Sequence, residues 1–376
     1  MKRGTELLRR GNEARRETLE RLLDLAWQSR LVNPTEGISY ALRAVLIADV
    51  AFHGEHKQRA AEVRARARGH LGNLLRITGD WNGAEQQLEL ATAHTHEAGS
   101  PAAVTAQIGH FQASLALDRQ DFSRSILEAG RASRFYRKAG DFEGIGRCRH
   151  HVGVTFWWSG HPERAAAAHE RALEDVSEAS NVAAILHSLG LALLDSGRLP
   201  EAGDAFGLVQ GLPHLLGALG PLGEARVRWA YGRLAAAAGS SSAARAYLSS
   251  ARETFVEQAL WLPAALITVD MAAAAMFAGN VLDSRRQCEA AEPFIKQAGY
   301  PTEGAALRIL REAAAQSAGV RLLTTVSRKA GLEIRPFLRP RHAQPVGVDS
   351  ATSFRRWRCR KETRQQQGGE EDEKYE

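Results

Sequence analysis

The sequence predicts an all-α protein built as a solenoid of antiparallel helix hairpins. Alanine and aliphatic residues dominate its apolar fraction, whereas aromatic residues make up only 7% of the 376 residues, a composition that favours packed helices over a β-sheet core. Residues that end helices recur about every 40 positions, and small residues recur at fixed offsets from them. Such self-similarity at a fixed period indicates a repeat architecture.

Two interleaved series of turn residues define the hairpins. The first series has a period of about 40 residues and consists of Gly79, Gln120, Gly160, Gly197, Gly239 and Gly279. The second lies about 20 residues after the first and consists of Gly99, Gly140, Ser180, Gly220, Ala259 and Gly299. Because glycine and polar residues favour helix ends, each period is expected to contain two helices joined by a tight turn.

Small residues mark where the two helices of each hairpin should cross. Seven residues before each first-series turn stand Gly72, Ala113, Gly153, Gly190, Gly232 and Ala272. Five residues after each turn stand Ala84, Ser125, Ala165, Ala202, Ala244 and Ser284. Seven residues further on stand Ala91, Ala132, Ala172, Val209, Ala251 and Ala291. Helices approach closely only where side chains are small, so these positions predict the interhelical contacts.

This pattern resembles that of the tetratricopeptide repeat family, which places Gly or Ala late in its first helix and Ala twice in its second. The segments GHLGNLLRITGDWNGAEQQLELA and HHVGVTFWWSGHPERAAAAHERA carry it most clearly. The family standard is 34 residues, so these longer repeats are similar to those of bacterial signalling regulators and kinesin light chains. The resemblance implies a right-handed superhelical solenoid.

The pattern also predicts the domain organisation. A degenerate first unit is visible in LERLLDLAWQSRLVNPTEGISYALRAVLIADV, where Asn33-Pro34 replaces the turn. We expect a flexible N-terminus at 1–16 and a solenoid at 17–335, with about seven repeats and a capping helix pair at 302–317 and 320–333. Residues 336–376 are rich in Arg and Pro, then acidic, and lack helical periodicity, so we expect this tail to be disordered.

Composition limits the environment. The three cysteines, Cys148, Cys288 and Cys359, are far apart and share no metal-binding spacing, which argues against a disulfide framework. The N-terminus lacks the apolar segment of a secretory signal, and no run of about 18 apolar residues suggests a membrane span. We therefore expect a cytoplasmic protein with no membrane association. The net charge of +6 owes much to arginines between Arg339 and Lys361.

No motif for catalysis is present. The sequence lacks a GxxxxGK[ST] loop, a strand-bounded GxGxxG, a GxSxG elbow and an HExxH motif. His94 and His96, like the adjacent His150 and His151, have spacings that suit metal chelation poorly. We interpret them as solvated histidines and predict no catalytic residue, no metal and no cofactor.

The family resemblance implies that the first helices of the repeats line a concave groove that contacts a ligand. Counting from the small residue of each first helix gives the positions that face this groove. The candidate binding residues are Arg66, Asn73, Arg76, His110, Arg147, His150, Trp157, His187, Arg226, Trp229 and Arg233. Arginine can bind a carboxylate with two hydrogen bonds, and tryptophan supplies apolar anchor area. The groove should therefore suit a protein or peptide ligand with acidic groups.

Two further expectations concern this groove. The carboxylate clamp of chaperone-binding family members is not reproduced, because its Lys and Asn have no counterparts beyond Asn73. His110, His150 and His187 occupy equivalent sites in three repeats, so protonation near pH 6 would add positive charge and tighten an acidic ligand.

The sequence is compatible with three functional hypotheses. The first is an interaction scaffold or regulatory module that binds a peptide or protein. The second is nucleic-acid binding through the Arg-rich tail around SFRRWRCRK, where Trp357 could stack on a base. The third is an enzyme with an unrecognised site near Arg147, His150 and His151. The sequence does not identify the partner or the oligomeric state.

Overall fold

The computed structural model describes residues 2–30, 33–50 and 57–298. Within these ranges the chain forms fourteen α-helices and no strand, which confirms the all-α prediction. By their internal contacts these residues divide into two compact units, Met1–Thr155 and Phe156–Glu376. The expected capping helices at 302–317 and 320–333 and the tail at 336–376 lie outside the described residues.

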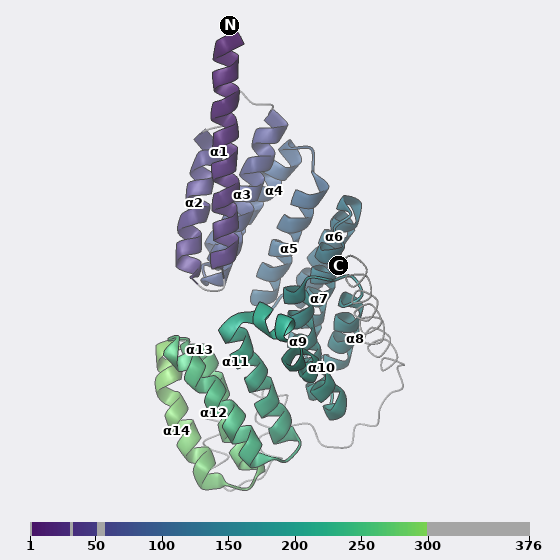
Figure 1. Cartoon of the computed structure of the whole chain (residues 1–376), viewed down its shortest axis with the longest axis vertical. Coiled ribbons are helices and arrows are strands. Elements are labelled where there is room, and N and C mark those ends of the chain that lie inside the picture. The colour runs from purple at the N-terminus through teal and green to yellow at the C-terminus, as the bar shows by residue number, and fades with distance from the viewer. Residues whose placement is uncertain (1, 31–32, 51–56, 299–376) are drawn as a thin grey trace, which may run out of the picture. The chain divides into compact units, whose positions relative to one another are not determined.

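Unit 1 contains three complete hairpins and most of a seventh helix, and the labelled helices can be followed in Figure 1. Its helices are α1 (Lys2–Ser29), α2 (Pro34–Val50), α3 (Lys57–Ile77), α4 (Trp81–Glu97), α5 (Ala102–Asp118), α6 (Phe122–Ala139) and α7 (Phe142–Trp158), which ends in unit 2. Residues 2–16, which we expected to be flexible, belong to α1, consistent with the high helix propensity of their Glu, Arg and Leu residues.

Unit 2 begins with the last turn of α7 and continues through seven further helices. These are α8 (Pro162–Ala172), α9 (Ala179–Asp195), α10 (Leu199–Gly211), α11 (Pro213–Ala237), α12 (Ser241–Glu257), α13 (Trp261–Phe277) and α14 (Val281–Ala298). In both units the odd-numbered helices are the first helices of the repeats. Neighbouring first helices contact one another directly, as α3 does α5, α9 does α11, and α11 does α13.

The predicted turns explain why each first helix ends where it does. All six residues of the first series have a left-handed backbone, with φ between 60° at Gln120 and 88° at Gly79. At the first of them, the N–H of Gly79 donates to the carbonyl of Arg76 at 3.1 Å, and that of Asp80 to Leu75 at 2.9 Å. Asp80 then caps α4 by accepting from the N–H of Gly83 at 2.9 Å. The same residues therefore end one helix and start the next.

The second series of turns is correct at four of the five positions that the structure describes. Gly99, Gly140, Gly220 and Ala259 have positive φ, but Ser180 lies inside α9. Helix α8 instead ends early, at Ala172, and the connection runs through residues 173–178. The prediction at Ser180 was wrong because it assumed that α8 has the same length as the other second helices, whereas α8 has only 11 residues. Gly299 lies outside the described residues.

The small residues lie at the helix crossings, as predicted. Gly72, Gly153, Gly190 and Gly232 are all buried, and the small residues of the second helices are at most 1% exposed, where their values are given. A β-carbon at Gly72 would lie 2.8 Å from Leu88 of α4, and one at Gly232 would lie 2.6 Å from Leu248 of α12. Large apolar side chains of the second helix thus occupy the space that glycine leaves open.

The connection between α10 and α11 departs from the other repeats. Helix α10 ends at Gly211, and residues 213–219 form a short helical segment that ends at Gly220, where φ is 65°, just before Pro221. Leu215 of this segment is buried in the core of unit 2.

Within the described ranges no single helix is long and apolar enough to span a membrane, although α10 and α11 together, bent by 94°, meet the length and composition criteria.

The turn at Ala259, which lacks glycine, gives a stability prediction. Ala259 has φ 53°, a conformation that costs an L-residue about 1 kcal/mol or more. We expect Ala259→Gly to raise the free energy of unfolding by about 1 kcal/mol in denaturant titrations. Ala278, at the end of the next first helix, has φ −76°, so Ala278→Gly should lower stability. Equal effects of the two substitutions would contradict this account.

Candidate functional site

Each candidate binding residue lies on a first helix, as the register requires. Arg66, Asn73 and Arg76 are on α3, His110 is on α5, and Arg147 and His150 are on the part of α7 that belongs to unit 1. Trp157 at the end of α7, His187 on α9, and Arg226, Trp229 and Arg233 on α11 belong to unit 2. We describe the surface of these helices, here called the first-helix face, separately in each unit.

In unit 1 the arginines of this face are already paired. Arg66 forms an ion pair with Glu20 of α1. Arg76 forms one with Asp118 of α5 at 2.6 Å, and its Nε donates to Asn73 at 3.1 Å. Asn73 itself is only 5% exposed. These side chains therefore link neighbouring repeats, and their charges are largely balanced within the chain.

Burial lowers the pKa of His110, the candidate residue on α5. The ring of His110 lies 5.5 Å from that of His151. Burial, followed by electrostatic interactions with His151 and Arg147, places the pKa of His110 well below its usual value. Arg147 itself pairs with Asp141 at 3.4 Å. His110 therefore stays uncharged near pH 6, contrary to the pH dependence expected from the sequence.

His151 is part of a buried hydrogen-bond cluster rather than a solvated residue. Its Nε2 shares a hydrogen bond of 2.8 Å with the hydroxyl of Ser125, which is 3.0 Å from Thr155 Oγ1. Ser125 and Thr155 are 0% exposed. Although a serine and a histidine at this distance resemble a catalytic pair, the buried Ser125 hydroxyl cannot reach a substrate. The cluster instead satisfies polar groups at a helix crossing.

In unit 2 five side chains form a ladder across four first helices, here called the indole–carboxylate ladder. Trp157 Nε1 of α7 donates to Asp195 of α9 at 2.7 Å. Arg233 of α11 donates to the other oxygen of Asp195 at 2.9 Å. Trp229 Nε1 of α11 donates to Asp270 of α13 at 2.6 Å. The ladder thus aligns two aromatic rings, two carboxylates and one guanidinium along consecutive repeats.

The ladder contains more negative than positive charge. The side chains of Arg233 and Asp195 are only 8% and 11% exposed, so their ion pair is well shielded from water. Burial raises the pKa of Asp270 to about 6, and the nearby Asp195 adds to this effect, whereas Arg233 and the Trp229 hydrogen bond oppose it. Two carboxylates therefore share the field of one guanidinium.

Asp195 and Asp270 were not predicted as site residues, although the sequence carries a signal for them. Each is the only Asp, Glu, Lys or Arg in its helix, ASNVAAILHSLGLALLD and WLPAALITVDMAAAAMF. A single charge on an apolar helix rarely serves solubility. The groove positions counted from the small residue did not include them, because each lies one residue beyond a counted position.

The two remaining candidates of unit 2 behave differently from one another. His187 Nε2 donates to the backbone carbonyl of Arg226 at 3.4 Å, and burial lowers the pKa of His187 to about 4. Its protonation near pH 6 is therefore also contradicted. Arg226 is exposed, and among the described residues its guanidinium has no ion-pair partner, unlike that of Arg66, Arg76, Arg147 and Arg233.

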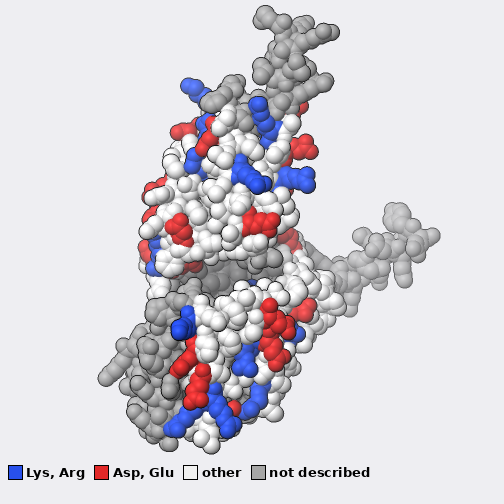
Figure 2. Space-filling model, turned by 90° about the vertical axis from the view of Figure 1, so that its left-hand side faces the viewer, with Lys and Arg blue, Asp and Glu red and all other residues white. Residues whose placement is uncertain are grey.

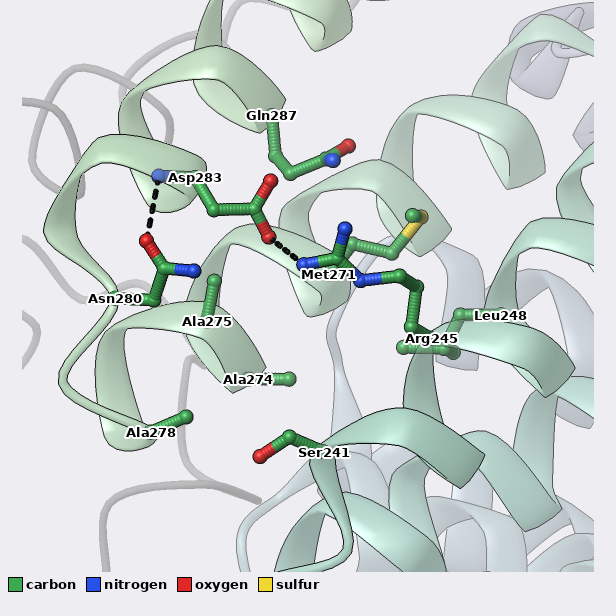
Figure 3. Close-up of a pocket in the computed structure, with 10 residues that line it drawn as sticks. All are labelled: Ser241, Arg245, Leu248, Met271, Ala274, Ala275, Ala278, Asn280, Asp283 and Gln287. Carbon is green, nitrogen blue, oxygen red and sulfur yellow. Dashed lines mark hydrogen bonds and ion pairs between the residues drawn. The ribbon is translucent and has the colours of Figure 1, made fainter.

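A small cavity lies away from this face, between α12, α13 and α14. It has a volume of about 60 Å³, and its lining combines apolar residues such as Leu248 and Met271 with polar ones such as Gln287. Arg245 and Asp283 point toward one another beside it and form an ion pair of 2.5 Å (Figure 3). Ligand pockets usually measure about 300 Å³ or more, so this cavity has room for a few water molecules only.

Surface charge is mixed where it can be seen. On the face in Figure 2, basic and acidic side chains are interspersed, and neither sign forms a continuous patch. Such a face lacks the basic footprint that binds nucleic-acid backbones.

In the described part of the chain, no group of three or more His, Cys, Asp or Glu residues is placed to hold a metal ion.

Comparisons with known proteins identify the class of fold. No family model and no curated protein match the chain. Among solved structures, the chain is similar to a Rap protein complexed with competence and sporulation factor, with 11% identity, coverage of 84% of this chain and 87% of that chain, and a TM-score of 0.63. It is also similar to aspartyl phosphate phosphatase F from Bacillus subtilis, with 10% identity, coverage of 87% and 97%, and a TM-score of 0.53.

A third similar structure is a signal transduction ATPase with a tetratricopeptide repeat sensor from Pyrococcus horikoshii. It is 13% identical, the match covers 86% of this chain and 53% of that chain, and the TM-score is 0.53. At these identities the likeness concerns the fold. The chain has a tetratricopeptide-type helical repeat fold, as the small-residue pattern predicted.

Proposed function

We propose that the chain is a protein-interaction module that binds an extended peptide or protein segment on the first-helix face of unit 2. The observation that carries this proposal is the indole–carboxylate ladder, which aligns aromatic and charged side chains across consecutive repeats. Such side chains are typical of binding hot spots. The complex of a similarly folded Rap protein with competence and sporulation factor supports the proposal by analogy of fold.

The spacing of the first helices suits an extended ligand. Neighbouring packed helices lie about 8–10 Å apart, and an extended chain advances about 3.3 Å per residue. Helices α9, α11 and α13, which contact one another in sequence, would therefore match a segment of roughly six residues. The cavity between α12, α13 and α14 is too small to hold such a ligand.

Arg226 and Trp229 are the residues from which we expect direct ligand contact. Arg226 is exposed without an ion-pair partner among the described residues, so it can bind a carboxylate of the ligand without breaking an internal pair. Trp229 lies one turn away, fixed by Asp270 and by an edge contact with Phe255. We therefore expect any preference of the protein for acidic ligands to depend on Arg226, and not on all five arginines among the candidate binding residues.

Peptide binding by purified variants tests this proposal. Heptapeptides selected on the whole protein from a random phage library would be titrated by fluorescence anisotropy. We expect Trp229→Ala to weaken binding about 30-fold or more, as for an aromatic hot spot, and Arg226→Ala to weaken it about 10-fold. Circular dichroism would show that both variants remain folded.

The matched control is Arg286→Ala on α14. Arg286 is an exposed arginine of a second helix in the same unit, so its loss changes the net charge equally without touching the first-helix face. Selected peptides that bind all three variants like the wild type would contradict the assignment of this face.

A further inference from the structure

Asp270 is the ladder carboxylate that forms no ion pair in the described part of the chain. Its partly buried carboxylate accepts a hydrogen bond from the neutral indole of Trp229 at 2.6 Å. The nearby guanidinium of Arg233 contacts Asp195 instead, at 2.9 Å. Among the described residues no ion pair includes Asp270. In direct contact, the carboxylate therefore has a neutral hydrogen-bond donor rather than a cation.

Such an arrangement is unfavourable for the free protein. A carboxylate removed from water loses hydration that a single indole hydrogen bond replaces only in part. The raised pKa of Asp270 agrees with this cost, because its first cause is burial. Leucine or alanine, which make up eight of the 17 residues of α13, would avoid the cost entirely. A cation that arrived beside Asp270 would remove it.

We propose that Asp270 binds a positively charged nitrogen of the peptide ligand, either a Lys or Arg side chain or the N-terminal ammonium. This inference rests on the proposed function and specifies its ligand. The indole that holds Asp270 also provides an aromatic surface beside the cation. Arg233 forms its ion pair with Asp195 of α9, so among the described residues no guanidinium is bound to Asp270 in place of the incoming cation.

The proposal gives the ligand a polarity. Exposed Arg226 on α11 offers a site for an acidic group, whereas Asp270 on the neighbouring α13 offers one for a basic group. A peptide across these helices would place its acidic and basic groups in one order only. This sharpens the sequence-based expectation of an acidic ligand into a ligand that carries both signs.

Peptides selected on the wild-type protein from a random heptapeptide phage library test the inference. We expect them to share a basic residue at one position or to require a free N-terminus. Synthetic versions would carry norleucine for Lys, citrulline for Arg, or an acetylated N-terminus, and these three arms identify the source of the charge. Loss of the charge should weaken binding to the wild type at least tenfold.

Asp270→Asn supplies the reciprocal test. Asparagine keeps an acceptor for Trp229 but removes the charge, so the variant should fold and bind charged and neutralised peptides equally, at the level of the neutralised peptide on the wild type. Asp204→Asn, an exposed aspartate of second helix α10, is the matched control and should behave like the wild type.

The outcomes separate this inference from the proposed function. Selected peptides that lack a common positive charge, or that bind Asp270→Asn as tightly as the wild type, would overturn the role of Asp270 while leaving peptide binding intact. Failure of the library to enrich any peptide on the wild-type protein would overturn both.

Discussion

Gly190→Ala is expected to lower the free energy of unfolding of unit 2 by about 1–3 kcal/mol, the usual cost of overpacking a closely packed core. A β-carbon at Gly190 would meet three ring carbons of Phe206, with Cδ1 at 2.6 Å and Cζ at 2.8 Å. Phe206 is 0% exposed, so its ring has no space into which it can move. This steric cost exceeds the gain in helix propensity of about 1 kcal/mol that alanine normally brings.

Denaturant unfolding followed by circular dichroism measures the effect, and Gly203→Ala is the control. Gly203 lies in the interior of α10, where an added β-carbon would meet only Leu234 at 3.6 Å, so alanine should stabilise the protein slightly. Phe206→Leu should partly relieve Gly190→Ala in the double variant. Independent, additive effects would mean that the two residues do not compete for the same space.

Glu170→Gln is expected to raise stability at pH 8 by up to about 3 kcal/mol and to change it little at pH 4. Glu170, near the end of α8, is 5% exposed, and its Oε1 has no hydrogen-bond partner. Burial raises its pKa to about 7 from the usual 4.5, with Arg198 opposing the shift. Between these values the folded state keeps a proton that the unfolded state releases. The contribution of Glu170 is therefore fully present below about pH 4.5 and lost as the pH rises through 7.

The measurement is the free energy of unfolding of both proteins from pH 4 to pH 8. The difference in free energy of unfolding between Glu170→Gln and the wild type should grow between pH 4.5 and pH 7 and then stay constant. Glu174→Gln, an exposed glutamate just beyond the same helix, should show no such window. A difference between wild type and Glu170→Gln that does not depend on pH would mean that ionisation of Glu170 is not responsible.

Most turns and helix crossings could be predicted because they depend on local residue type. Glycine adopts positive φ without a steric penalty, and only small residues allow close approach of helices. Ser180 was misplaced because the period assumes helices of equal length, whereas α8 has only 11 residues. The short helical segment at 213–219 ends at Gly220, which already belongs to the second series of turns. The 40-residue period therefore does not reveal this segment.

The helices that carry the candidate residues were predicted correctly, but the pairing of these residues with one another was not. The register placed Trp157, Trp229 and Arg233 on first helices, yet their partners Asp195 and Asp270 stand 38 or 41 residues away. Pairing over such separations depends on how far each side chain reaches between repeats. The histidines failed for a related reason, since burial of His110 and His187, which lowers their pKa values, depends on neighbouring helices.

The direct contacts between neighbouring first helices bear on how the protein loses its structure. Within the described residues, the extensive helix contacts join elements that are adjacent or next-but-one along the chain. Each hairpin is therefore stabilised mainly by its immediate neighbours, as in a one-dimensional array. Local opening should then produce a graded pattern of amide hydrogen exchange rather than a single cooperative event. A destabilised hairpin would expose its neighbours first, which gives a protease a defined order of attack.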